Sequence, residues 1–348
     1  MNRNYSLDFS RGLMALAVAL GHYFYCNNNT NSFPLSFILA VDYFFILSGY
    51  VLTGSILNKN NFDALNFAKS RWLRLFPVYI FCVIVSLILC YCLGIQQAKP
   101  RLGDIIKIIS IGQMLPFNTG SKFLYLGPLD VAWSISAEFW IGIIFFPVIY
   151  FLNKNRSELC FVFLTLSILV SFFIINNYSP NYLDVNYVKY TPLIFFGLLR
   201  GYMGYSLGAL TFFITKVITK DSVNNHKSSF ISLLQLTLLL ILIILYARNN
   251  YNRRDEYFSI FLFAIMIISL SFEKGFVYNL TNNWCGKWLG KISYPLYLLH
   301  PIFIEVNRQI FENLFSLVPI LLYLLFTIIF SILIHIYIEN KFLIYFRK

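Results

Sequence analysis

The chain has 348 residues, of which 58% are hydrophobic, 19% aromatic and only 12% charged, and its mean hydropathy is +0.68. A soluble domain carries about twice that share of charge, so this composition excludes an ordinary soluble protein and favours an integral membrane protein. The formal net charge of +12 would suggest nucleic-acid binding in a soluble chain, but here the cations lie between apolar runs. We therefore expect contacts with membrane lipid headgroups and no nucleic-acid partner.

A membrane-spanning helix needs about 20 mainly apolar residues, and the chain offers ten such stretches in order. They lie near residues 7–27, 33–57, 76–95, 131–152, 158–176, 201–218, 229–248, 256–273, 291–313 and 317–338. The predicted fold is therefore an all-α integral membrane protein, with about ten transmembrane helices in one bundle around a polar central cavity. We expect a single domain over residues 1–348. The longest connection, about 95–130, is expected to be an external loop that caps the bundle.

Ten spans would place both termini on the same side of the membrane. The segments on that side then hold 16 Lys and Arg residues against 10 on the other side, with Arg11 left inside the membrane. This bias predicts that both termini are cytoplasmic. The six cysteines show neither metal-ligand spacing nor a disulfide framework, so we expect no metal site.

Arg11 and His22 lie eleven positions apart within the first apolar stretch. Ionisable side chains are costly in hydrocarbon and often mark a substrate path or a reaction centre. Eleven residues make about three helical turns, so both side chains share one face and lie roughly 16 Å apart along the axis. This spacing suits a long ligand that is held at Arg11 and reacts near His22. Two plainer interpretations stay open, namely that Arg11 simply pairs with Asp8 and that His22 is a hydrogen-bonded helix contact.

Depth estimates place four more ionisable groups relative to Arg11 and His22. At about 1.5 Å per residue, His22, Asp42 and Glu138 fall in one layer near the outer surface, whereas Arg11, Arg71 and Arg74 gather at the inner face. The outer layer predicts a polar cavity open to the outside. As alternatives, Arg71 and Arg74, which precede the third predicted span, are simple positive-inside anchors, and Glu138 satisfies a neighbouring helix by a hydrogen bond.

Beyond single residues, an ordered set of motifs resembles the family-3 membrane acyltransferases. These motifs are the Arg-x10-His pair of Arg11 and His22, the segment DYFFILSGY from Asp42 to Tyr50, RWLRLFP from Arg71 to Pro77, WSISAE from Trp133 to Glu138, ISYPLYLLHP from Ile292 to Pro301, and Tyr337-Ile338-Glu339 before a basic tail. Each motif is weak alone, but their order and their coverage of nearly the whole chain are specific. Ser70 departs from the pattern, because many members carry a basic residue before the first arginine of RWLRLFP.

The resemblance implies a ten-helix enzyme of the bacterial cytoplasmic (inner) membrane that moves an acyl group, usually acetyl, from acetyl-CoA to a carbohydrate of the cell envelope. The acceptor would be O-antigen (lipopolysaccharide), exopolysaccharide, capsule or a lipid-linked glycan. Acetyl-CoA would be a co-substrate, and no bound cofactor is expected. Many members carry an additional SGNH-hydrolase-like domain. This chain ends soon after its last predicted helix, so we expect the stand-alone type.

The candidate residues then receive roles. His22 would be the general base, and Arg11 would complete the catalytic set. Glu138 would orient either the His22 imidazole or the acceptor hydroxyl, and Asp42 would do so less directly. Arg11, Arg71 and Arg74 would bind the phosphates of acyl-CoA. The acceptor cavity would be lined by Asp42, Ser48, Trp133, Tyr297 and His300. For Ser48, beside Gly49, tight helix packing is the alternative.

Two rival functions remain at this point. A transporter or flippase of a glycolipid or small anion would use the same intramembrane charges, but it would not explain the ordered motifs. A purely structural membrane subunit has no need of His22, Asp42 and Glu138 in one layer. Detection of acylated product would separate an enzyme from both rivals.

Overall fold

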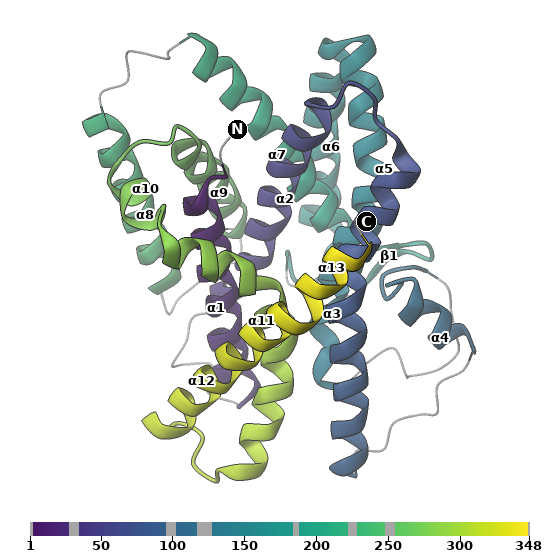
Figure 1. Cartoon of the computed structure of the whole chain (residues 1–348). Coiled ribbons are helices and arrows are strands. Elements are labelled where there is room, and N and C mark those ends of the chain that lie inside the picture. Colours follow the sequence, from purple (N-terminus) through teal and green to yellow (C-terminus); the bar gives the residue numbers. More distant parts are fainter. Residues whose placement is uncertain are drawn as a thin grey trace.

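A computed structural model of the chain describes residues 3–27, 35–94, 102–116, 127–183, 188–221, 228–247 and 255–346. The α-helices are α1 (Tyr5–Cys26), α2 (Ala40–Leu57), α3 (Ala64–Cys92), α4 (Leu102–Ile109), α5 (Trp133–Asn155), α6 (Ser157–Tyr178), α7 (Phe196–Asp221), α8 (Ser228–Ala247), α9 (Asp255–Ser271), α10 (Phe276–Thr281), α11 (Trp284–Ile310), α12 (Leu317–Ile334) and α13 (Lys341–Phe346). Between them lie the 3-10 helices η1 (Leu35–Leu39) and η3 (Gly127–Ala132), the π-helix η4 (His335–Asn340), and the antiparallel strands β1 (Lys189–Thr191) and β2 (Ile194–Phe195). Figure 1 shows the long helices side by side in a bundle.

Each of the ten predicted stretches contains a long helix in the described part of the chain. Six of these helices are apolar and long enough to cross a membrane: α2 together with part of η1, α3, α5, α6, α8, and α12 with the residues that follow it. In the residues that the structure describes, the protein is thus an all-α membrane protein apart from one short strand pair. The other four long helices, α1, α7, α9 and α11, fall short of that standard in length or in apolar character. Two of them, α1 and α11, carry the charges and histidines of the motifs.

Local sequence explains where the first helices begin. Asn4 precedes α1, and its side-chain oxygen accepts hydrogen bonds from the backbone N–H groups of Ser6 and Leu7. Asp63 caps α3 in the same way. These caps satisfy N–H groups that have no partner within the helix. The cap at Asp63 also shows that the third helix begins twelve residues before its predicted start at residue 76.

Small residues let α1 and α11 approach closely. A side chain at Gly12 would lie 2.3 Å from the side chain of Leu289, and one at Gly290 would lie 2.4 Å from Asp8. Backbones that are this close leave no room for even a methyl group. The two helices therefore run side by side (Figure 1), and this contact places the Arg11 end of α1 against the start of the ISYPLYLLHP motif.

A second close approach joins α2 to α7. At Gly208 an added Cβ would lie 2.0 Å from the backbone oxygen of Ile46, and at Gly49 it would lie 2.5 Å from the backbone oxygen of Tyr205. The Ser48–Gly49 pair thus sits at a tight helix contact, as the packing alternative for this pair requires.

The predicted external loop at 95–130 contains a helix that packs against the bundle. Within its described residues, the backbone oxygen of Ile109 accepts a hydrogen bond from the indole of Trp72 on α3, and that of Ser110 accepts one from Trp140 on α5. The short helix α4 buries Asp104 and exposes apolar side chains such as Ile106. Residues 102–116 thus pack against the bundle, as expected of a segment that caps it, although part of them forms the helix α4. Proline and glycine in this segment suggested a loop, but they do not prevent it from packing against neighbouring helices.

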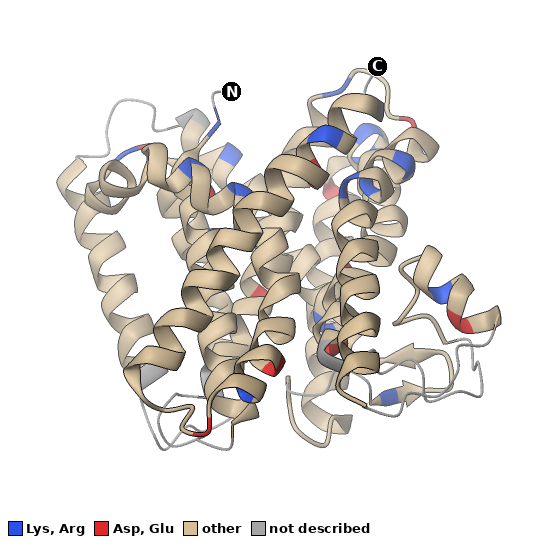
Figure 2. Ribbon diagram, turned by 60° about the horizontal axis from the view of Figure 1, so that its bottom comes forward, with Lys and Arg blue, Asp and Glu red and all other residues tan. Residues whose placement is uncertain are grey.

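Both chain ends lie at the same end of the bundle, and many of the lysines and arginines gather there (Figure 2). We call this the terminal end and the opposite one the far end. Hydrogen bonds at each end are consistent with helices that alternate in direction through the bundle. The hydroxyl of Tyr150, late in α5, donates to the backbone oxygen of Asn60 after α2. At the far end, Arg308 of α11 donates to Asn27 at the end of α1, 2.7 Å away.

Candidate active site

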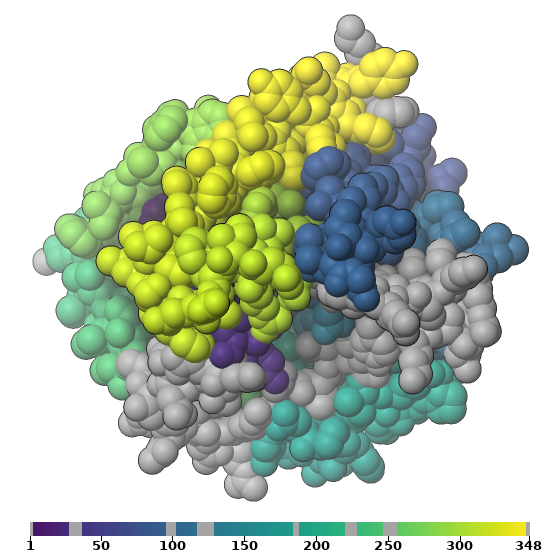
Figure 3. Space-filling view, turned by 90° about the horizontal axis from the view of Figure 1, so that it is seen from below, coloured from purple at the N-terminus to yellow at the C-terminus, as the bar shows by residue number. Residues whose placement is uncertain are grey.

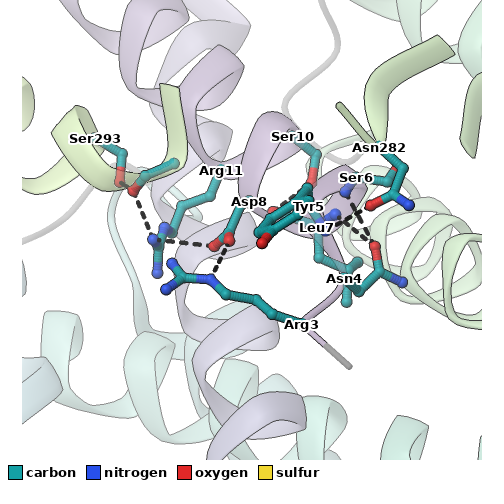
Figure 4. A network of polar contacts seen from close by, with 11 residues as sticks. Arg3, Asn4, Tyr5, Ser6, Leu7, Asp8, Ser10, Arg11, Asn282 and Ser293 are labelled. Carbon is teal, nitrogen blue, oxygen red and sulfur yellow. Dashed lines mark hydrogen bonds and ion pairs between the residues drawn. The ribbon is translucent and has the colours of Figure 1, made fainter. Parts of the chain in front are cut away.

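Arg11 lies in a polar network at the terminal end (Figure 4). Its Nη2 donates to the backbone oxygen of Gly290 on α11 at 2.6 Å and to Asp8 Oδ1 at 3.3 Å. The Asp8 carboxylate also accepts a hydrogen bond from Arg3 at 2.6 Å. The pairing with Asp8 is therefore real, but one carboxylate serves two guanidinium groups. The network remains cationic and faces α11.

The second cationic group of the terminal end lies on α3. Arg71 is buried and forms a salt bridge with Glu138 of α5. Arg74, one turn later, is exposed and lies within electrostatic range of Arg71, Arg11 and Glu138. The three arginines predicted to bind the donor are thus neighbours in space, although they come from two helices.

Two of these guanidinium groups keep an unused donor. Among the described residues, Nε of Arg11 and Nε of Arg71 are buried and have no hydrogen-bond partner. Burying an N–H without a partner costs about 1–3 kcal/mol, and more next to a charge. Phosphate and carboxylate oxygens are the ligands that best satisfy such donors. An anionic group bound at this end would satisfy both donors, which is the chemistry that the prediction of a phosphate site requires.

The placement of Glu138 corrects the predicted separation into layers. Glu138 was expected near His22 in an outer layer, with Arg71 at the inner face, yet Glu138 and Arg71 are directly bonded. The cause is the early start of α3 at Ala64, which places Arg71 seven residues inside the helix, or roughly 10 Å deeper than a loop position. Glu138 therefore holds Arg71, and its predicted role in orienting His22 or the acceptor hydroxyl stays a prediction.

His22 instead meets His300 of α11. Nδ1 of His22 lies 3.0 Å from Nε2 of His300, and the two rings are stacked. Nδ1 of His300 lies 2.7 Å from the backbone oxygen of Tyr297. A carbonyl oxygen only accepts, so His300 must carry its proton on Nδ1, and its neutral ring then offers Nε2 as an acceptor. His22 therefore donates through Nδ1, and its own Nε2 is the basic nitrogen.

The histidine pair lies toward the far end of the bundle. His22 is in the last turns of α1 and is only half-buried, whereas His300 is fully buried. Seen from the far end, the end of α1 (purple) reaches the surface beside α11 and α12 (lime to yellow) in Figure 3. His22 thus lies nearer than Arg11 to the far end of the bundle, as the spacing along α1 predicts.

Asp42 is committed to a partner that the sequence did not suggest. It is 1% exposed and accepts two hydrogen bonds from Arg200 of α7, from Nε at 2.9 Å and from Nη2 at 2.7 Å. Arg200 also lies over the ring of Trp133, 5.6 Å from its centroid. Asp42 and Trp133 therefore belong to a buried ion-pair cluster, and their place in an acceptor cavity stays a prediction. In the sequence analysis, Arg200 was one of the ten Lys and Arg residues assigned to the outer side of the membrane. Its place at the edge of an apolar helix was a signal that it could pair with an intramembrane carboxylate.

The remaining candidates connect these groups. Ser48 neighbours the hydroxyl of Tyr205, which donates to the backbone oxygen of Glu138 at 3.2 Å. Tyr297 is buried, and its hydroxyl accepts a hydrogen bond of 2.8 Å from Ser134 in the WSISAE motif. The candidate residues thus fall into three groups: a donor end, a histidine pair and the Asp42–Arg200 pair.

Comparison with known proteins supports the motif reading. The acyltransferase-3 family model, described as an acyltransferase domain, matches residues 4–336. A protein of Staphylococcus aureus strain COL, provisionally named an O-acetyltransferase, is 26% identical over 95% of this chain and 56% of its own length. "Protein 2 in picA locus" of Rhizobium radiobacter is 31% identical over 34% of this chain and 62% of its own length.

The chain spans about three-fifths of the length of these curated relatives. No solved structure matches it. The family match nevertheless covers nearly every helix that carries a motif, from α1 to α12. The chain belongs to the acyltransferase-3 family, and its several apolar helices are those of a multi-pass membrane protein.

Proposed function

We propose that this protein is an O-acyltransferase that moves an acyl group, in the first instance acetyl, from a cytoplasmic acyl-CoA to a hydroxyl of a cell-envelope carbohydrate. The observation that carries the proposal is the hydrogen-bond chain from His22 through His300 to the Tyr297 carbonyl. This chain makes Nε2 of His22 the nitrogen that accepts a proton. Acyl transfer to an alcohol needs such a base at the attacking oxygen.

In the proposed reaction, Nε2 of His22 takes the proton of the sugar hydroxyl as its oxygen attacks the thioester carbonyl. The new C–O ester bond forms, the C–S bond breaks, and the proton passes to the thiolate, which leaves as CoA-SH. His300 keeps the His22 ring in the required tautomer throughout, because its Nε2 accepts the Nδ1 proton. No bound cofactor or metal is required for these steps.

The donor would enter at the terminal end. The phosphates of CoA would bind at a cationic entrance, which we call the arginine mouth. It consists of the unpartnered Nε groups of Arg11 and Arg71 and the exposed Arg74 beside them. The pantetheine arm would then follow α1 for the roughly 16 Å that separates Arg11 from His22. Glu138 would fix Arg71 in this mouth. The geometry thus supports a two-ended site, with phosphate recognition at one end and acyl transfer at the other.

The topology belongs to the same proposal. All ten long helices would cross the bacterial cytoplasmic membrane as one domain around a polar cavity, with both termini in the cytoplasm. The acceptor, a lipid-linked glycan or a polysaccharide such as O-antigen, exopolysaccharide or capsule, would reach His22 from the far end.

Envelope composition tests the acceptor class. Mass spectrometry of isolated glycans should show ester-linked acyl groups that disappear when the gene is deleted and return when it is restored on a plasmid. Glycans with the same acyl content in all three strains would contradict the proposed acceptor. Mild alkali provides a control, because it removes O-linked esters and leaves amide-linked acyl groups in place.

A further inference from the structure

The buried Asp42–Arg200 pair has no role in the proposed chemistry, yet it is the most completely bonded ion pair of the described residues. Arg200 is 2% exposed and Asp42 is 1% exposed. Removing two charges from water costs several kcal/mol per ion, and good geometry is required to offset that cost. A bidentate pair of this kind fixes position more than it adds stability.

Arg200 holds more than Asp42. Its Nη1 donates to the backbone oxygen of Leu183 at 2.7 Å, and its Nη2 donates to the backbone oxygen of Ile38 at 2.8 Å. One guanidinium thus connects α7, α2, the segment after α6, and η1. Of these, η1 is a five-residue 3-10 helix, an element with few hydrogen bonds of its own, so its position depends on such outside contacts.

The residue next to Ile38 in η1 touches the proposed base. Phe37 is 3% exposed, and its ring meets the His22 ring edge to face at a centroid distance of 4.9 Å. The same ring lies directly over Gly21, where an added Cβ would be 2.0 Å from the ring carbon Cγ of Phe37. Phe37 and His300 therefore contact His22 and together restrict how its ring can turn.

We infer that Asp42 and Arg200 are positioning residues, which hold η1 so that Phe37 sets the orientation of the His22 imidazole for acyl transfer. The inference rests on the proposed function, because it assumes that His22 is the base. Misplacing a reacting group by about 1 Å can cost on the order of 10²-fold in rate. Loss of the pair should therefore appear in kcat and leave donor recognition at the terminal end unchanged.

A double-mutant cycle on the purified, full-length protein tests this. Asp42→Asn with Arg200→Gln removes both charges together, so no buried charge is left unpaired, and Phe37→Leu removes the ring contact. Each change should lower kcat for acetyl transfer by about 10–100-fold, with KM for acetyl-CoA within about twofold of wild type. Because both act through one contact, the combined variant should be no slower than the slower of the two. The inference would be overturned if the two fold-losses in kcat multiplied in the combined variant. It would also be overturned if the neutralised pair kept a wild-type kcat.

Arg308→Gln is the matched control. Arg308 also anchors a chain segment at the far end, through Asn27, but it has no described contact with η1. Its effect on kcat should multiply with that of Phe37→Leu. If the neutralised pair fails to fold, Gly21→Ala displaces the Phe37 ring without touching Arg200 or Asp42, and it should lower kcat to the same degree. A wild-type kcat for folded Gly21→Ala would also refute the inference.

A His22→Ala variant in the same assay separates this inference from the proposed function. Suppose that wild-type protein transfers acetyl, that His22→Ala does not, and that the kcat losses in the double-mutant cycle multiply. In that case only the positioning role fails. If His22→Ala is as active as wild type, the proposed base fails, whatever the cycle shows.

Discussion

The two ring nitrogens of His22 differ in protonation because Nδ1 faces one acceptor, on a helix that is far away in the sequence but adjacent in space. His300 lies 278 positions away in the sequence, and its orientation is fixed in turn by a backbone carbonyl. This arrangement assigns a tautomer, and the tautomer decides which nitrogen can take a proton. It follows that the chemistry of His300 matters more than its bulk.

Substitutions at His300 should separate these two properties. Gln can still present an oxygen to the Nδ1 proton of His22, whereas Leu fills the space with no acceptor. We expect His300→Gln to keep a substantial part of the transfer rate and His300→Leu to lose on the order of 10²-fold or more, since a misdirected base loses most of its contribution. The check is kcat of protein that elutes as a single folded species. Equal rates for Gln and Leu would refute the tautomer argument.

At the donor end, Arg74 differs from Arg71 because it is exposed and has no carboxylate bonded to it among the described residues. Arg74→Ala should raise the Kd for acetyl-CoA about tenfold, the effect of losing one charge-assisted contact, with little change in folding. Lys69→Ala, also exposed on α3, should bind acetyl-CoA as wild type does. Titration of detergent-solubilised protein measures both. A wild-type Kd for Arg74→Ala would remove Arg74 from the donor site.

The residues of these two ends were largely identifiable from sequence, but their pairings were not. Helical spacing along α1 related Arg11 to His22, and the motifs included both His300 and Glu138. Depth along an axis, however, does not reveal which faces of separate helices meet. That information was missing for Arg200 and Asp42, which lie 158 positions apart, and for the bond between Arg71 and Glu138.

At the scale of elements, glycines decide how closely the helices that carry the site approach. Gly290 allows α11 to lie against Asp8 of α1, and this contact also gives Arg11 its bond to the backbone of α11. The length of the apolar runs identified where the long helices would form, because each apolar stretch must satisfy its own backbone in lipid. It could not identify the early start of α3, because residues 64–75 include charged side chains that a hydropathy window excludes.

Gly290→Ala tests the contact between α1 and α11. Its new methyl group would lie 2.4 Å from Asp8, so we expect a loss of about 1–3 kcal/mol, the usual effect of overpacking, and a lower unfolding temperature in detergent. Gly142→Ala is the control, since its Cβ would come no closer than 3.8 Å to Phe146, and alanine favours a helix. It should unfold at the wild-type temperature or above. A Gly290→Ala variant as stable as the control would contradict the close contact.

For the whole molecule, the charge distribution and the direction of the helices favour one orientation in the membrane. Both chain ends lie at the cationic terminal end (Figure 2), and His22 lies toward the other. The proposed orientation puts the arginine mouth in the cytoplasm, where acyl-CoA is made, and the histidine pair at the outer side, where envelope glycans are available.

Cysteine labelling tests this orientation. In a background without the six native cysteines, Asn60→Cys at the terminal end should be protected from an impermeant thiol reagent in intact cells, and Asn313→Cys at the far end should react. Both positions are exposed in the structure. Permeabilised cells, in which both should react, provide the control. Labelling of Asn60→Cys alone in intact cells would invert the topology and place the donor mouth outside.

The central claim is that this chain transfers an acyl group with His22 as the base. The most direct measurement follows acetyl transfer from radiolabelled acetyl-CoA to isolated envelope glycan by purified wild-type protein and by folded His22→Ala. The account predicts an alkali-labile ester on the glycan with the wild type. It also predicts a rate lower by about 10²–10⁴-fold with His22→Ala. Equal rates of ester formation by the two proteins would contradict it.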